Sequence, residues 1–293
     1  MADPRISVIL PAWNSHDTVA ACLESLRHQT FRDFEVVLVD SSANRRTAEI
    51  VQARFPEVVY HPTSERLSAH AARNCGAAIA RGSILVFSDP DCLMNPDWLE
   101  RLSAVTQEHS FVGGAVGNAA GGWFENAVHF TKYAWWLPGG LPQARPEIPS
   151  ANMALTRSLF SRIGPIPEDW CGDTLLSHRA ATAGVTPWFE PAALVRHDHR
   201  VTFIAFVKER LLRGYDYGLV RPRVSGWSRA RCLMMALLFP VVAAVMTLRA
   251  LQYAALTGNL RPMILALPVV VLGYTVRAIG EAAAHGRLVW RGL

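Results

Sequence analysis

Lysine is almost missing from this chain of 293 residues, and charge of either sign is scarce. Charged residues make up 18% of the sequence, hydrophobic residues 51%, and lysine stands at positions 132 and 208 alone. A surface that binds nucleic acid carries a dense stripe of lysine and arginine, which this sequence does not contain. Since the net charge is still +5, we expect no nucleic-acid partner and instead a phosphate-bearing ligand or an anionic membrane face.

Several sequence signatures are absent as well. The five cysteines form no C-x-x-C pair and no zinc-ligand spacing, so we interpret them as reduced packing residues of a cytosolic domain. The first apolar run, Ile6 to Leu10, is not followed by G-x-G-x-x-G, which argues against a dinucleotide oxidoreductase. That run is also too short for the apolar core of a signal peptide, so we expect no secretory leader.

Short apolar runs alternate with amphipathic segments in the first hundred residues. The runs are typical of buried strands and lie at 6–10, 34–39, 58–60 and 84–87. Between the first two, Val19, Cys22, Leu23 and Leu26 have helical spacing. This alternation predicts an α/β fold with a mainly parallel sheet, helices on both faces, and ligands at the carboxyl ends of the strands.

Carboxylates stand at two of those strand ends. Asp40 ends the second run, and Asp89 and Asp91 follow the fourth in the stretch "FSDPDC". Two acids this close repel each other unless a cation neutralises them or water solvates them. We therefore expect a metal ion or a cationic ligand here, with a solvated turn as the alternative.

Composition changes after residue 230. Cys232 to Leu248 and Pro262 to Val276 carry no charge and are bracketed by arginines. As helices these runs would reach roughly 22–26 Å, short of the ~30 Å hydrocarbon core of a bilayer. We predict a two-helix membrane hairpin, with a re-entrant, interfacial or buried pair as alternatives. Most nearby arginines lie outside the connection, which predicts that both termini and the N-terminal domain face the cytosol at the inner membrane.

Four pieces of sequence occur in a characteristic order: "ISVILPAWN" (6–14), "FEVVLVDSSANRRT" (34–47), "AARNCGAAIARGSILVFSDPDC" (71–92) and "ANMALTRSLFSRIGPIPEDWCGD" (151–173). This order resembles family 2 glycosyltransferases of the GT-A fold, over about residues 4 to 215. The resemblance implies a nucleotide-diphosphate sugar donor and a Mg²⁺ or Mn²⁺ ion. We therefore expect a GT-A domain at 1–205, an interfacial amphipathic linker at 206–230, and a membrane hairpin with a cytosolic tail at 231–293.

Donor-binding positions of the family match residues in these motifs. Pro11, Ala12 and Asn14 match the turn beneath the nucleotide, for which an ordinary strand-to-helix turn is the alternative. Asp40 matches the acid that accepts a hydrogen bond from the base, and its alternative is a cap or turn aspartate.

Asp89-Pro90-Asp91 matches the family's D-x-D motif. A hard cation would bridge these oxygen ligands and the diphosphate, with Asp91 on the metal and Asp89 on the ribose or a metal-bound water. His197 and His199, in "VRHDHR", are further candidate metal ligands between which the sequence does not choose.

Two other matches point to the donor. Arg73 and Asn74 match the family's "ARN", where the arginine pairs with phosphate or braces the acids; a surface salt bridge is the alternative. Asn152 matches an asparagine near the donor sugar, and its alternative is a turn amide.

Asp173 is the predicted general base. An inverting transfer needs one carboxylate to take the proton of the acceptor hydroxyl. The family usually has Glu-Asp at this point, whereas this chain has Gly172-Asp173, and Glu168 and Asp169 are nearby rivals.

The resemblance implies inverting, metal-dependent transfer of a sugar to a membrane-bound, lipid-linked or glycan acceptor. The Q-x-x-R-W signature of processive members is absent, so we expect one sugar to be added per encounter. One alternative is a polyprenyl-phosphate sugar synthase, whose phosphate acceptor needs little base catalysis. The other is an inactive nucleotide-binding scaffold subunit of a membrane assembly.

Overall fold

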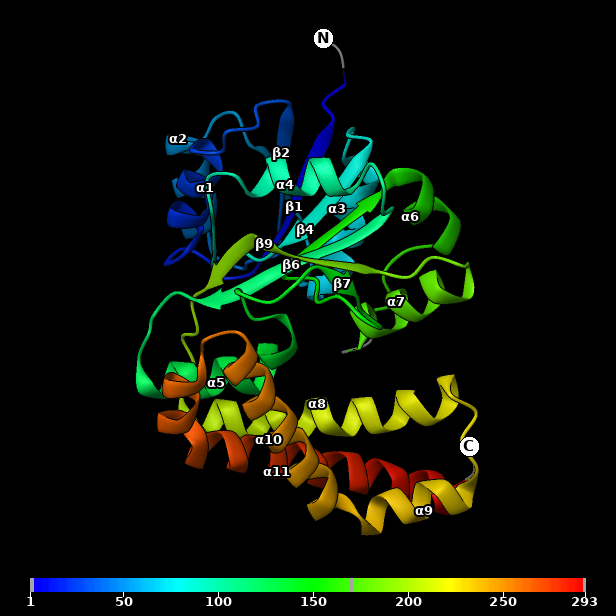
Figure 1. The fold of residues 1–293 in the computed structure, drawn as a ribbon. Helices are drawn as coiled ribbons and strands as arrows, with labels where there is room; N and C mark the ends of the chain where they lie inside the picture. Colours follow the sequence, from blue (N-terminus) through cyan, green and yellow to red (C-terminus); the bar gives the residue numbers. More distant parts are fainter. Residues whose placement is uncertain (1–2, 169–170, 292–293) are drawn as a thin grey trace. The chain divides into compact units, whose positions relative to one another are not determined.

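The computed structural model describes residues 3–168 and 171–291, and the chain divides into two compact units (Figure 1). The first unit comprises Met1–Ala119, Gly140–Glu168 and Gly172–Asp198. The second comprises Ala120–Gly139, Asp169–Cys171 and His199–Leu293. The first unit contains the sheet, and the second is built from helices.

One half of the sheet is parallel, and its inner strands β1 and β4 are buried. Its strands lie in the order β3-β2-β1-β4. Their bounds are Ile6–Ala12 for β1, Phe34–Asp40 for β2, Val59–Pro62 for β3 and Ile84–Ser88 for β4. Every residue of β1 and β4 is buried, which is why these strands appear in the sequence as continuous apolar runs and not as alternating patterns.

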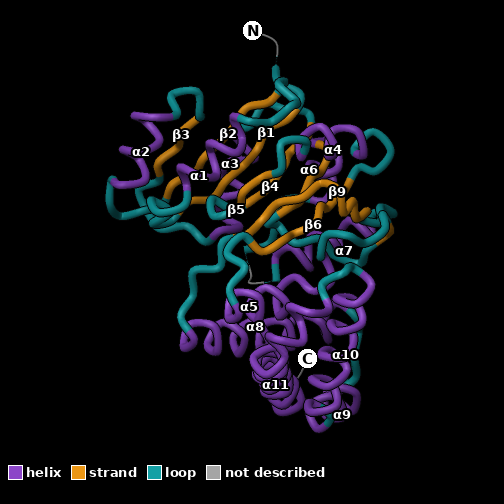
Figure 2. Tube along the Cα trace, turned by 60° about the vertical axis from the view of Figure 1, so that its left-hand side comes forward, coloured by secondary structure: helices purple, strands orange, loops and turns teal. Residues whose placement is uncertain are grey.

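The other half of the sheet mixes directions. Its strands are β5 (Cys92–Met94), β6 (Phe111–Asn118), β7 (Gln143–Ala144), β8 (Asn152–Thr156) and β9 (Trp188–His197). β8 lies antiparallel between β4 and β6, and β9 pairs parallel with β6 and antiparallel with β5 and β7. Over the described residues this makes one nine-stranded mixed sheet, shown in orange in Figure 2. The predicted α/β fold is confirmed, with an antiparallel part that the sequence did not indicate.

Helices flank the sheet of the first unit. They are α1 (Val19–Arg27), α2 (Arg46–Arg54), α3 (Ala69–Ile79), α4 (Trp98–Val105), α6 (Arg157–Ile163) and α7 (Gly172–Thr182). The predicted apolar face of α1 is buried. α3 packs closely on the sheet at Gly76, where an added Cβ would lie 2.5 Å from Cγ2 of Ile9 in β1. This close packing fixes the position of the polar residues that α3 carries.

The second unit has its own apolar core. Its helices are α5 (Trp123–Tyr133), the 3₁₀ turn Ala134–Trp136, α8 (Phe203–Val224), α9 (Arg229–Leu237), α10 (Phe239–Leu256) and α11 (Leu260–Arg291). Phe130 of α5, Phe206 of α8, Ala250 of α10 and Tyr274 of α11 share one buried cluster. α8 packs closely on α11 at glycines: a Cβ at Gly214 or Gly280 would lie 2.0 or 2.2 Å from a backbone oxygen of the other helix, and one at Gly218 would lie 2.8 Å from the carbonyl oxygen of Glu281. Such small-residue crossings are common between helices in membranes.

The predicted hairpin is present, but the bounds predicted for its first helix were wrong. α10 and α11 are joined at residues 257–259, where Gly258 has the positive φ of +73° that favours glycine. The run Cys232 to Leu248 does not form one helix, because α9 ends at Leu237 and α10 starts afresh at Phe239 with a proline in its first turn. Both α10 and α11 are long and apolar enough to cross a membrane, and 17% of the apolar window of α10 is buried.

Candidate active site

Four side chains that can bind a metal ion meet at the carboxyl end of β4. Asp89 and Asp91 follow β4, and β5 then pairs with β9 so that Cys92 lies opposite His197. One ligand atom from each of these four residues lies within 4.8 Å of those of the others. Nε2 of His197 is 3.5 Å from Oδ1 of Asp91 and 3.9 Å from Oδ2 of Asp89. The β5–β9 pairing therefore places His197 beside the two acids.

The donor set of this cluster suits a hard or borderline divalent cation. Two carboxylates and one imidazole offer oxygen and nitrogen ligands, which Mn²⁺ and Mg²⁺ accept. The Cys92 thiol is fully buried. Burial raises its pKa well above the usual value, and the charges of Asp91 and Asp89 raise it further. Mg²⁺ and Mn²⁺ prefer oxygen and nitrogen ligands to sulfur, so the carboxylates and the imidazole are the fitting ligands.

The structure separates the two histidines between which the sequence did not choose. His199 belongs to the second unit, where its Nε2 lies 3.0 Å from Nδ1 of His129 and its ring is close to that of Tyr133. His197 belongs to the first unit and to the acidic cluster. His197 is thus the candidate metal ligand of the two.

Arg73 braces the acidic cluster from α3. Its side chain is buried, and Nη2 donates a hydrogen bond to Oδ1 of Asp89. A surface salt bridge is therefore the wrong description of Arg73, and the bracing interpretation of the sequence agrees with this geometry. The guanidinium also lies 3.4 Å from Nδ1 of His70, one helical turn earlier.

Two of the predicted donor-binding asparagines, Asn74 and Asn152, form hydrogen bonds within the first unit. Asn74 donates to the carbonyl of Ile166 and accepts from its N–H, at 2.8 and 2.9 Å, so it pins the segment that leads to α7. Asn152 is fully buried; its amide nitrogen donates to the carbonyls of Ala115 and Ala193, and its oxygen accepts from the indole of Trp98. These contacts give both amides a bracing role within the first unit.

The carboxylate of Asp40 is held at the edge formed by β1 and β2. Oδ1 accepts from the N–H and hydroxyl of Ser42, and Oδ2 accepts from the hydroxyl of Tyr60 at 2.8 Å. Burial raises the pKa of Tyr60, and its hydrogen bond to Asp40 raises it further, so Tyr60 remains a neutral donor. A carboxylate accepts about four hydrogen bonds, which leaves Asp40 one acceptor position for a ligand.

The predicted turn beneath the nucleotide adjoins Asp40. Pro11 and Ala12 end β1, and Ala12 stands opposite Asp40 in the parallel register. Asn14 has a positive φ of 53°, and its N–H donates to Ser42 at 2.7 Å. The structure thus brings all four of these predicted positions together. Trp13, for which the sequence analysis gave no role, is 47% exposed beside them, and the guanidinium carbon of Arg66 lies 3.8 Å from the centre of its ring.

Asp173 lies at the start of α7 and is mostly buried. Its Oδ2 accepts from the N–H of Ser150 at 3.2 Å and from the hydroxyl of Ser150 at 3.4 Å. Its Oδ1 lies 3.7 Å from Nε2 of His70. Of its two rivals, Glu168 is exposed, and Asp169 lies outside the described residues.

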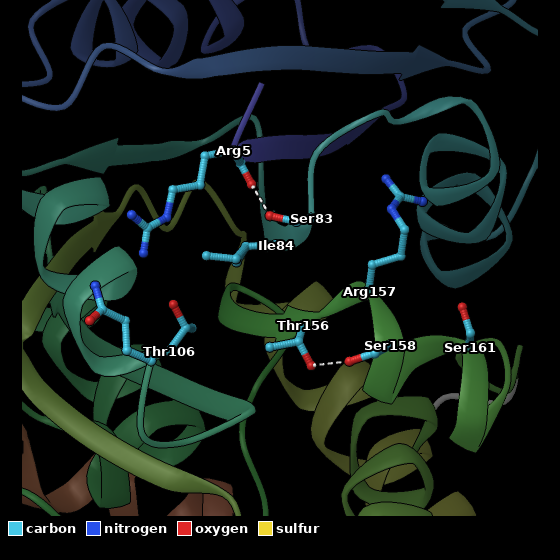
Figure 3. Close-up of a pocket in the computed structure, with 9 residues that line it drawn as sticks. Arg5, Ser83, Ile84, Thr106, Thr156, Arg157, Ser158 and Ser161 are labelled. Atoms are coloured by element: carbon cyan, nitrogen blue, oxygen red, sulfur yellow. Dashed lines mark hydrogen bonds between the residues drawn. The ribbon is translucent and has the colours of Figure 1, made fainter. Parts of the chain in front are cut away.

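A separate hollow of about 570 Å³ lies in the first unit beside the first residues of β1 and β4 (Figure 3). Arg5 and Arg157 line it, but both guanidinium groups already donate to main-chain carbonyls, such as those of Ser103 and Gly82. Among the described residues, none of the predicted site residues lines it. The hollow lies at the amino ends of the strands, whereas Asp40 and Asp89 lie at the carboxyl ends. It is therefore a poor candidate for the active site.

Comparison with known proteins gives consistent matches. The profile described as "Glycosyl transferase family 2" matches residues 7–162. "Glycosyltransferase AglE" of Haloferax volcanii is 30% identical over 219 residues, which cover 67% of this chain and 68% of that protein. A "PGL/p-HBAD biosynthesis glycosyltransferase" of Mycobacterium bovis is 34% identical over 114 residues, which cover 37% of this chain and 44% of that protein.

Among solved structures, the mannosyltransferase PcManGT of Pyrobaculum calidifontis, in complex with GDP-Man and Mn²⁺, is similar in fold. The TM-score is 0.55 at 20% sequence identity, and the match covers 92% of this chain and 88% of that one. At this identity the likeness establishes the fold alone.

Proposed function

The chain belongs to glycosyltransferase family 2, and from this we propose that it transfers a sugar, with inversion, from a nucleotide-diphosphate donor to a membrane-bound or lipid-linked acceptor. It is a glycosyltransferase with the predicted GT-A fold. One observation carries the proposal: the cation-binding cluster and the predicted base lie in the same unit and are linked through Arg73 and His70.

The donor would lie across the carboxyl ends of the parallel strands β1, β2 and β4. Asp40 uses its remaining acceptor position for an N–H of the base, and the turn at Asn14 supports the nucleoside. The solved PcManGT, with GDP-Man and Mn²⁺ bound, supports a nucleotide-sugar donor for this fold. Asp91 and His197, with Asp89, would hold a Mg²⁺ or Mn²⁺ ion, which supplies positive charge beside the diphosphate.

Asp173 acts as the general base in this proposal. The acceptor oxygen forms a bond to C1 of the sugar while the bond from C1 to the diphosphate oxygen breaks, and the hydroxyl proton passes to Asp173. A single displacement of this kind inverts the anomeric centre. Ser150 holds the other carboxylate oxygen, so Oδ1 has a defined direction.

The acceptor would be presented at a membrane. α10 is apolar and mostly exposed, which suits contact with lipid better than contact with water. We place the catalytic unit on the cytosolic side of the inner membrane because arginines concentrate outside the α10–α11 connection. The boundaries at residues 205 and 230 stay predictions; α8 extends across the first of them.

A donor panel tests the proposed function. Purified full-length protein in detergent is incubated with UDP-, GDP- and dTDP-sugars, with and without membrane lipid extract, in MnCl₂, MgCl₂ or EDTA. We expect at least one donor to be consumed with a divalent cation and none in EDTA. Equal consumption in EDTA would contradict metal dependence, and no consumption of any donor would favour the inactive scaffold. A polyprenyl-phosphate acceptor, already ionised, would show itself by transfer that survives Asp173→Asn.

A further inference from the structure

His70 occupies the space next to the predicted base. It lies in the first turn of α3 and is nine-tenths buried, and its Nε2 faces Oδ1 of Asp173 at 3.7 Å. Its Nδ1 lies 3.4 Å from a guanidinium nitrogen of Arg73. The imidazole therefore stands between the arginine that binds Asp89 and the carboxylate of Asp173.

Gly172 leaves the space that the imidazole of His70 occupies. A Cβ built at Gly172 would lie 2.7 Å from Cδ2 and 2.9 Å from Nε2 of His70, and 2.2 Å from the carbonyl oxygen of Pro167. Distances this short are not tolerated, so a side chain at 172 would have to displace the imidazole of His70 and the carbonyl of Pro167 from these positions. The absence of an acidic residue before Asp173 is thus matched by the presence of an imidazole from α3.

The contact with Arg73 determines which nitrogen of His70 carries the proton. A guanidinium group only donates hydrogen bonds, so Nδ1 of His70 must be the acceptor in this contact. In the neutral imidazole the proton then lies on Nε2, which is the nitrogen that faces Asp173. Arg73 itself is fixed by its hydrogen bond to Asp89.

We propose that His70 is a positioning residue for Asp173, with its Nε2–H directed at Oδ1 by the chain of contacts from Asp89 through Arg73. This inference rests on the proposed function. The distance of 3.7 Å is longer than a hydrogen bond, and catalytic contacts of this kind commonly shorten when substrate binds. His70 holds the carboxylate that receives the acceptor's proton and does not itself enter the reaction.

A spectroscopic test needs no substrate. The full-length protein, labelled with ¹⁵N-histidine in detergent, is examined by long-range ¹H–¹⁵N correlation at pH 7.5, and the His70 signals are identified by their loss in His70→Gln. We expect the neutral tautomer protonated at Nε2. A tautomer protonated at Nδ1, or a doubly protonated ring, would overturn the proposal whether or not the enzyme activity is found.

A kinetic test uses the donor consumed in the panel, with water as the acceptor and MnCl₂ present. His70→Asn and His70→Ala should lower kcat about 10- to 100-fold, as expected for a displaced reacting group, while KM for the donor changes less than about 2-fold. His70→Gln places an amide N–H near the position of Nε2 and should keep kcat within about 5-fold of the wild type. His28→Ala, at an exposed histidine after α1, is the matched control.

The double variant decides whether His70 acts through Asp173. In the Asp173→Asn background, His70→Ala should lower kcat by less than about 2-fold further, because the effects of substitutions at residues that act as a unit are not additive. An equal loss in both backgrounds, or a His70→Gln protein no better than His70→Asn, would refute the positioning role. If the wild type consumes no donor, the proposed function fails, and the tautomer result alone decides the inference.

Discussion

Replacing Asp91 by asparagine should change stability and metal binding in opposite directions. The ligand atoms of Asp89 and Asp91 lie within 4.8 Å, at which two like charges repel by about 3.5 kcal/mol for an effective dielectric constant of ~20. Arg73 already pairs with Asp89, and the Asp91 side chain is 33% exposed, so much of this repulsion is offset. We therefore expect Asp91→Asn to stabilise the metal-free protein by about 1 kcal/mol, or a Tm higher by about 2–4 °C.

Binding of the metal ion should make the wild type more stable than Asp91→Asn, the reverse of the order expected without metal. A cation that binds only the folded protein adds about 2.7 kcal/mol at a concentration of 100 Kd. The wild type should gain this stabilisation from MnCl₂, whereas Asp91→Asn loses a charged ligand and should gain little. At high MnCl₂ the wild type should therefore be the more stable protein.

Thermal unfolding in detergent measures both effects after treatment with EDTA and again across a MnCl₂ titration. Asp97→Asn is the matched control, since Asp97 is a surface aspartate whose partner is Arg101, one turn away on α4. The control should respond to MnCl₂ as the wild type does. An Asp91→Asn protein that is less stable without metal and is still stabilised by MnCl₂ would refute the assignment of the cation site.

Other measurements test the remaining parts of the account. Asp173→Asn should lower kcat by about 10²–10⁴-fold with donor affinity little changed. Steady-state kinetics in which only KM for the donor rose would contradict this. Tyr60→Phe should weaken nucleotide binding about 5-fold by calorimetry, because one hydrogen bond that orients the base-binding carboxylate is lost. Burial raises the pKa of Cys22 and Cys92, so thiolate stays scarce as the pH rises to 8. Mass spectrometry should then find both unmodified by maleimide in the folded protein and modified only after denaturation. Leu256→Cys, 72% exposed at the end of α10, should react with an impermeant thiol reagent from the non-cytosolic side; labelling only from the cytosolic side would mean a re-entrant or surface-lying hairpin.

The parallel half of the fold could be predicted because its buried strands are continuous apolar runs in the sequence. Strands covered on both faces appear as apolar runs, and the carboxylates that follow them mark the edge where ligands bind. Asp40, Asp89 and Asp91 were predicted on this basis, and the structure places each at or just beyond the end of its strand.

The contacts made by the antiparallel strands could not be predicted in the same way. The pairing of β5 with β9 joins residues about a hundred positions apart, and no local pattern selects His197 over His199. Asn152 matches a donor position, and the sequence did not show that its amide nitrogen donates to the carbonyls of Ala115 in β6 and Ala193 in β9. His70 had one usable signal, its spacing of three residues from Arg73 on the same helix.

The helix boundary at Leu238 was missed for a different reason. Absence of charge over residues 232–248 fits one long helix, and this reading gave no weight to Pro240, the one helix-boundary signal within the run. The structure starts a new helix at Phe239, where Pro240 is tolerated only in the first turn. Arg249 consequently lies inside α10 instead of ending it.

We propose above all that a divalent cation and a nucleoside diphosphate bind together at the carboxyl ends of β4 and β9. Crystals of the full-length protein grown with MnCl₂ and GDP, and then with MnCl₂ and UDP, allow the cation to be located by anomalous scattering at the manganese edge. We predict one manganese peak in contact with Asp91 and His197, next to the diphosphate of a nucleotide whose base contacts Asp40. A bound diphosphate without manganese at this cluster, or manganese bound elsewhere on the first unit, would contradict it.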